Sequence, residues 1–138
     1  MKNFIEGYVN ALTSEECAKI ISYMNEEGRL TPGRVKEPNT GKDIVFKEYK
    51  DSLDVIMNFR EKGEINEILL NSLTKCISLY TRKHPQMNNI DYWEVDSFYN
   101  LQKYNPGQCF SSTHCENASK VTSHRVLAWM YYLNTVKD

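Results

Sequence analysis

Two side chains late in the chain, His114 and Glu116, have the types and spacing of a metal-binding pair. Residues two apart on an extended chain point to the same face, so this imidazole and this carboxylate could hold one ion together. One nitrogen donor and one oxygen donor suit Fe(II) or Mn(II). The same spacing is also found in solvated loops that bind nothing, and the spacing alone leaves both interpretations open.

A zinc site is a second way to use this stretch, with Cys109, His114, Cys115 and His124 as ligands. Thiolate and imidazole are the ligands that zinc prefers. The adjacent pair His114 and Cys115 would nevertheless point to opposite faces of a strand, and no Cys-x-x-Cys or His-x-x-x-His accompanies it. A zinc-binding module therefore ranks third among our hypotheses. His84 and His124 are interpreted as structural residues at the end of a helix and the start of a strand.

Two long strands are predicted on either side of this motif, over residues 92–104 and 126–133. Both segments are rich in aromatic and β-branched residues and lack helical spacing. Along the first strand, alternation places Gln102 and Tyr104 on one face, which we expect to be wet or functional, and Tyr99 and Leu101 on the other, which we expect to pack.

The N-terminal half predicts a short strand over residues 4–9 and two helices. Thr13 and Glu16 have the form of a capping box, so an amphipathic helix is expected over residues 13–27, with Gly28 ending it. A second helix is expected over residues 64–82, stopped by His84 and the proline after it. Residues 28–50 are rich in turn residues and predict a long loop with one short strand over 44–46.

The order of these elements, helices first and strands later, predicts an α+β architecture in a single domain over residues 1–138. The chain has 17 basic and 18 acidic residues, a net charge of −1, and no basic block, which disfavours nucleic acid as a partner. The longest apolar run, residues 126–133, is far shorter than the ~20 residues a membrane-spanning helix needs, so no membrane partner is expected. The N-terminus develops no secretory signal, and four sparse cysteines fit reduced thiols, so we expect a cytoplasmic protein.

An ordered series of motifs resembles the prolyl 4-hydroxylase-like family of Fe(II)- and 2-oxoglutarate-dependent dioxygenases. In members of that family, a strand ending in Gln-x-Tyr is followed along the chain by x-Pro-Gly, an aromatic residue and the His-x-Asp of the metal site. An Arg and a strand ending in Tyr-Leu-Asn come next. The corresponding residues here are Gln102-Lys103-Tyr104, Asn105-Pro106-Gly107, Phe110, His114-Cys115-Glu116, Arg125 and Tyr132-Leu133-Asn134. Glu116 stands where the family usually has Asp.

The resemblance implies a double-stranded β-helix, a cupin-like jelly roll, with N-terminal supporting helices. Residues 1–90 would form the helical support region with its leading strand, and residues 91–138 the first core strands with the His-x-Glu motif. His114 and Glu116 would be metal ligands, and Tyr104 and Tyr132 would contact the cosubstrate, with Gln102 on the face of Tyr104. The implied cofactors are Fe(II) and 2-oxoglutarate, with ascorbate optional, and the implied substrate is a peptide or a small molecule.

The same resemblance leads us to expect a truncated jelly roll, because the family's distal His and its 2-oxoglutarate-binding Arg or Lys have no counterpart in the 138 residues. We expect this chain to be inactive by itself and to form a homodimer or aggregate through an exposed sheet edge. A non-catalytic binding or assembly module on the same fold is the main alternative.

Overall fold

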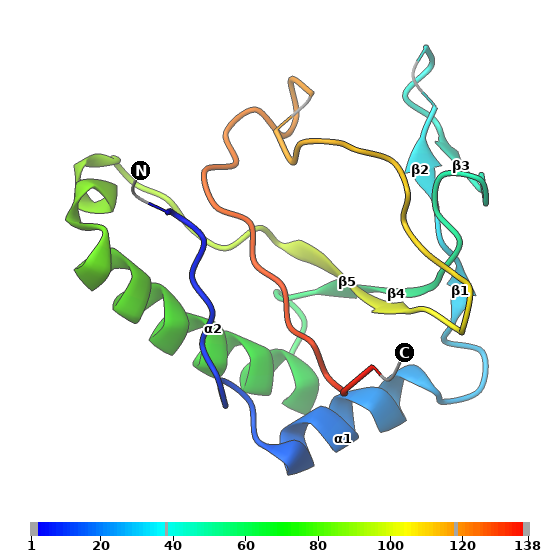
Figure 1. The fold of residues 1–138 in the computed structure, drawn as a ribbon, viewed down its shortest axis with the longest axis horizontal. Helices are drawn as coiled ribbons and strands as arrows, with labels where there is room; N and C mark the ends of the chain where they lie inside the picture. The colour runs from blue at the N-terminus through cyan, green and yellow to red at the C-terminus, as the bar shows by residue number, and fades with distance from the viewer. Residues whose placement is uncertain (1–2, 38, 118, 137–138) are drawn as a thin grey trace. The chain divides into compact units, whose positions relative to one another are not determined.

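The computed structural model describes residues 3–37, 39–117 and 119–136 of the chain. In chain order the elements are α1 (Ser14–Met24), β1 (Thr31–Pro32), β2 (Val35–Lys36), β3 (Asp43–Ile44), β4 (Leu53–Asn58), α2 (Glu64–Lys83), the short 3-10 helix η1 (Pro85–Asn89) and β5 (Phe98–Lys103) (Figure 1). β1 pairs antiparallel with β4, and β2 pairs antiparallel with β3. The larger sheet has the order β1-β4-β5. The described residues therefore form a mixed α+β structure with small sheets, and they do not form a jelly roll.

Local signals place both helices close to their predicted bounds. At the start of α1 the Glu16 carboxylate accepts a hydrogen bond from the Thr13 backbone N–H at 2.7 Å, while the Thr13 hydroxyl accepts one from the Glu16 N–H at 3.2 Å. This is the predicted capping box. The helix ends at Met24, three residues earlier than expected, and Gly28 follows with a left-handed φ of 78°.

α2 buries one face and ends where the sequence indicates. Its buried apolar residues recur at helical spacing: Ile65, Leu69, Leu73 and Tyr80. The helix closes at His84, whose backbone N–H donates to the Tyr80 carbonyl at 2.8 Å. None of the described helices combines the length and apolar composition needed to cross a bilayer.

The chain divides into two compact units that interleave along the sequence. The first comprises residues 1–23 and 56–100, and the second comprises residues 24–55 and 101–138. The first unit holds most of the buried apolar side chains: Ile20, Met57, Ile65, Leu69, Leu73, Tyr80 and Tyr99. The second unit buries Met24, Val55 and Leu101 together with three polar residues, Lys50, Ser52 and Asp54.

The strands differ from the sequence predictions more than the helices do. β5 is shorter than the predicted strand over residues 92–104, although it keeps the expected alternation, with Tyr99 and Leu101 buried and Gln102 exposed. Residues 4–9 and 126–133 form no strand, because strand propensity alone does not supply a neighbouring strand to complete the hydrogen-bond ladder. The predicted strand over residues 44–46 appears as β3, two residues ending at Ile44. β4, which the sequence analysis did not predict, is the longest strand together with β5.

Candidate metal-binding site and a second polar pocket

The motif that carries His114 begins with a tight turn in the second unit. The Gln108 backbone N–H donates to the Asn105 carbonyl at 2.9 Å, and Gly107 has a φ of 84°. Pro and Gly at the two central positions, with a positive φ at the glycine, are typical of a type II turn. The Gln108 side chain accepts from the Asn105 N–H at 2.8 Å and donates to Asp51 at 3.0 Å.

The segment after this turn is anchored to the residues that precede β4. Lys50 and Phe110 form an antiparallel bridge, with the Asp51 N–H donating to the Cys109 carbonyl and the Ser111 N–H donating to the Tyr49 carbonyl, each at 2.9 Å. The backbone is therefore held up to Ser111, three residues before His114. Sequence analysis did not predict this pairing, because it joins segments about 60 residues apart.

His114 and Glu116 lie together, as their spacing predicts. Nε2 of His114 is 3.5 Å from Oε1 of Glu116, and both side chains are about half exposed. Nδ1 of His114 is 2.9 Å from the Ser112 carbonyl. A carbonyl can only accept, so Nδ1 carries the proton, and in the neutral ring Nε2 keeps its lone pair for a metal.

The second oxygen of Glu116 is held by Arg125, whose Nη1 is 3.1 Å from Oε2. The oxygen that faces His114 is thus distinct from the one that faces Arg125. Two ligands each about 2.1 Å from a metal and at a right angle to each other stand roughly 3 Å apart. The observed 3.5 Å between Nε2 and Oε1 is close to that separation, and an imidazole with a carboxylate fits Fe(II).

A third protein ligand does not join this pair in the described part of the chain. No group of three or more His, Cys, Asp or Glu side chains that could hold a metal occurs among residues 3–37, 39–117 and 119–136. The zinc arrangement of Cys109, His114, Cys115 and His124 is therefore not assembled there. All four cysteines are free thiols, and Cys109 and Cys115 are exposed.

The predicted cosubstrate residues have different surroundings. The Tyr104 hydroxyl donates to Gln102 at 3.3 Å, so these two share a face as predicted. Burial, followed by the nearby Asp54 charge, raises the pKa of Tyr104, and a hydrogen bond with Ser52 partly opposes that rise. Tyr132 lies in an irregular segment and is 82% exposed.

A buried ion pair that sequence analysis missed lies beside Tyr104. Nζ of Lys50 is 2.6 Å from Oδ2 of Asp54, and the Ser52 hydroxyl donates to Oδ1 of the same carboxylate at 2.8 Å. All three residues are at most 5% exposed. These residues are two apart, so they share one face of an extended segment. Because all three are polar, the sequence pattern alone would place that face toward solvent.

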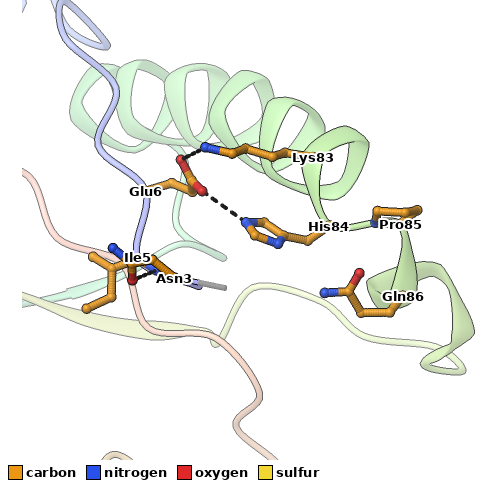
Figure 2. Close-up of a pocket in the computed structure, with 7 residues that line it drawn as sticks. All are labelled: Asn3, Ile5, Glu6, Lys83, His84, Pro85 and Gln86. Carbon is orange, nitrogen blue, oxygen red and sulfur yellow. Dashed lines mark hydrogen bonds and ion pairs between the residues drawn. The ribbon is translucent and has the colours of Figure 1, made fainter. Parts of the chain in front are cut away.

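The first unit has its own polar pocket, of about 440 Å³, formed by the N-terminal segment and the end of α2 (Figure 2). Figure 2 shows the Glu6 carboxylate facing both Lys83 and His84. One carboxylate oxygen is 2.6 Å from Nζ of Lys83, and the other is 3.0 Å from Nε2 of His84. The hydrogen bonds from Lys83 and His84 hold the pKa of Glu6 below its usual value.

His84 ends α2, as predicted, and its side chain is also buried. The centroid of its ring lies 4.5 Å from that of Tyr80 and 5.4 Å from that of Phe4. The Tyr80 hydroxyl also donates a hydrogen bond to the Phe4 carbonyl at 2.9 Å. These contacts fasten the N-terminal segment to α2. Because Glu6 already contacts both Lys83 and His84, we interpret the pocket as a structural clasp.

Comparison with family models, with curated proteins and with solved structures found no match to this chain.

Proposed function

We propose that this chain contributes two metal ligands, His114 and Glu116, to an Fe(II)- and 2-oxoglutarate-dependent oxygenase of the prolyl 4-hydroxylase-like kind. The observation that carries the proposal is the pair itself: Nε2 and Oε1 are 3.5 Å apart, while Nδ1 is engaged by the Ser112 carbonyl and Oε2 by Arg125. Outer partners of this kind fix the orientation and tautomer of metal ligands. The ordered motif series from Gln102 to Asn134 supports the same function.

Each residue has a stated role in this proposal. His114 and Glu116 bind the metal, and Tyr104 and Tyr132 contact the cosubstrate, with Gln102 orienting the Tyr104 hydroxyl. Fe(II), when bound with 2-oxoglutarate and dioxygen, supplies the oxidative chemistry that hydroxylates a peptide or small-molecule substrate. A facial triad needs a third protein ligand, which the described residues do not add to the pair.

The second candidate is a non-catalytic binding or assembly module. The contact between Arg125 and Glu116 favours this candidate. The Arg125 cation lies 3.1 Å from Oε2 of Glu116 and already neutralises part of the negative charge that would attract a metal. In that case the His114 and Glu116 pair would order the loop without binding an ion.

Metal titration distinguishes these candidates. We expect His114→Ala to lower Mn(II) affinity by at least tenfold and the matched control His124→Ala to leave it unchanged, since only His114 faces Glu116. Glu116→Asp restores the family's usual ligand and should keep or improve the affinity. Equal losses in both histidine variants, or zinc binding that needs Cys109 and Cys115, would contradict the proposal.

A succinate-release assay with Fe(II) and 2-oxoglutarate tests whether the pair suffices for turnover. We expect no detectable succinate from the 138-residue chain, because two protein ligands make a weak metal site. Succinate above the His114→Ala background would mean that a third ligand lies within this chain, and His124 would be the first residue to test.

A further inference from the structure

The pair of Lys50 and Asp54 is buried, and a buried ion pair is weak evidence of a gain in stability. Their side chains are 4% and 7% exposed. Desolvating two charges is expensive, and apolar residues of the same size often stabilise a fold as well or better. Gly33 lies against this cluster: a Cβ there would overlap the Ser52 hydroxyl oxygen and lie 3.2 Å from Cε of Lys50. The backbone is therefore shaped around these polar groups.

A continuous series of contacts leads from this pair to the proposed metal ligand. Lys50 Nζ lies 5.5 Å from the centroid of the Phe110 ring, within the range of a cation–π interaction. The Phe110 ring stacks on the His114 imidazole, with centroids 4.5 Å apart and planes inclined by 20°. Lys50 and Phe110 are also joined through the backbone by their antiparallel bridge.

The same polar cluster lies near Tyr104, the proposed cosubstrate residue. The Asp54 carboxylate, to which Ser52 donates, lies close enough to Tyr104 that its charge adds to burial in raising the pKa of that phenol. Tyr104 and the Phe110 ring that stacks on His114 thus both lie near one buried ion pair, although neither Lys50 nor Asp54 lies in the motif itself.

We infer that the Lys50 and Asp54 ion pair is a positioning device, which sets the imidazole plane of His114 for metal binding by fixing Phe110; this inference rests on the proposed function. Asp54 fixes the Lys50 ammonium, the ammonium faces the Phe110 ring, and the ring supports the imidazole. Metal ligands must be held within about 0.5 Å, and a half-exposed loop histidine needs such support.

Proton NMR of the His114 ring tests the inference on two readouts. Stacking on Phe110 shifts the ring protons of His114 upfield from those of the exposed His124, and bound Mn(II) broadens them. The chain has three histidines, so the matching alanine variants assign the signals. The test variant is Lys50→Met with Asp54→Leu, which removes both charges and leaves neither unpaired.

We expect this double variant to stay folded, to lose the upfield shift and to bind Mn(II) about 10- to 100-fold more weakly. The matched control is Lys36→Met with Asp43→Leu, which removes an exposed pair, 2.8 Å apart, on the β2 and β3 strands. The control should change neither readout. Lys50→Arg, which keeps the charge, should also retain both.

The two proposals fail in different ways. A folded double variant that keeps the upfield shift and the Mn(II) affinity would overturn the positioning role and leave the metal site standing. A wild-type protein whose His114 signals are not broadened by Mn(II) would overturn the proposed function and the positioning role with it. Should the double variant unfold, Phe110→Leu decides the question: unchanged Mn(II) affinity in that variant would also overturn the positioning role.

Discussion

At the scale of single residues, Asn66 shows how a buried amide can define a local structure. Its amide nitrogen donates to the Asn58 and Glu61 carbonyls at 2.8 and 2.7 Å, and its oxygen accepts from the Tyr99 hydroxyl at 2.6 Å. Asn66 therefore joins the start of α2 to the turn after β4 and to β5. Every polar atom of the side chain has a partner, which is the condition under which a buried amide is favourable.

Tyr99→Phe tests this amide directly. The variant keeps the stacking of the ring on Phe59, whose centroid is 4.1 Å away, but leaves the Asn66 oxygen without its donor. We expect a loss of about 1–3 kcal/mol in the free energy of unfolding, measured by urea denaturation. Tyr92→Phe is the matched control, because it removes a hydroxyl that bonds the exposed Glu94, and it should change the stability by less than about 0.5 kcal/mol. Equal effects would contradict this role for Asn66.

At the scale of elements, the N-terminal segment and the end of α2 depend on each other. Figure 1 shows the segment before α1 running alongside α2. Besides the clasp at Glu6, the Ser72 hydroxyl donates to the Ala11 carbonyl at 2.7 Å. Residues 3–13 pair with no strand, so side-chain contacts of this kind hold them in place.

Glu6→Gln should destabilise the protein in a pH-dependent way. The folded state lowers the pKa of Glu6 from its ordinary value of 4.5, so the carboxylate contributes stability above that value and loses it as the pH falls through the lowered pKa. The difference in melting temperature between wild type and variant should therefore be full at pH 7 and shrink in acid. Glu27→Gln, at an exposed position, is the control. A difference that grows as the pH falls would contradict the clasp.

At the scale of the whole molecule, the eight-residue apolar run over residues 126–133 carries four exposed large apolar side chains: Val126, Trp129, Met130 and Tyr132. Met130 is 73% and Tyr132 is 82% exposed, and the run forms no strand in the described part of the chain. An exposed apolar segment of this composition is prone to pair with another copy. The homodimer or aggregate predicted from the sequence is thus still expected, though through this segment rather than a formed sheet edge.

Sedimentation velocity over a range of concentrations tests this association. We expect the wild-type chain to associate as its concentration rises, and Met130→Lys to weaken the association because a charge opposes burial at the contact. Val121→Lys adds the same charge at a residue that is 80% exposed but outside the run, and should have little effect. A wild-type chain that stays monomeric at every concentration would contradict the prediction.

The two helices were predictable from the sequence because their signals are local. Each signal involves residues within about two turns of one another. These signals are the reciprocal hydrogen bonds of Thr13 and Glu16, the glycine after α1 and the apolar spacing along α2. The closeness of His114 and Glu116 was predictable for the same reason, since only two positions separate them. Alternation along β5 likewise needs no knowledge of a distant partner.

Tertiary structure alone decided the features that depend on residues far apart in the chain. β4 carries Asp54, a charge that is buried only because Lys50 and Ser52 satisfy it, so a hydrophobic pattern could not predict the strand. His84 is buried because Glu6 and Phe4, about 80 positions earlier, pack against it. Conversely, residues 126–133 have strand propensity and form no strand, because a strand requires hydrogen bonds from a neighbour that propensity does not provide. Local chemistry thus determined the helices and the closeness of His114 and Glu116, whereas long-range contacts determined what supports them.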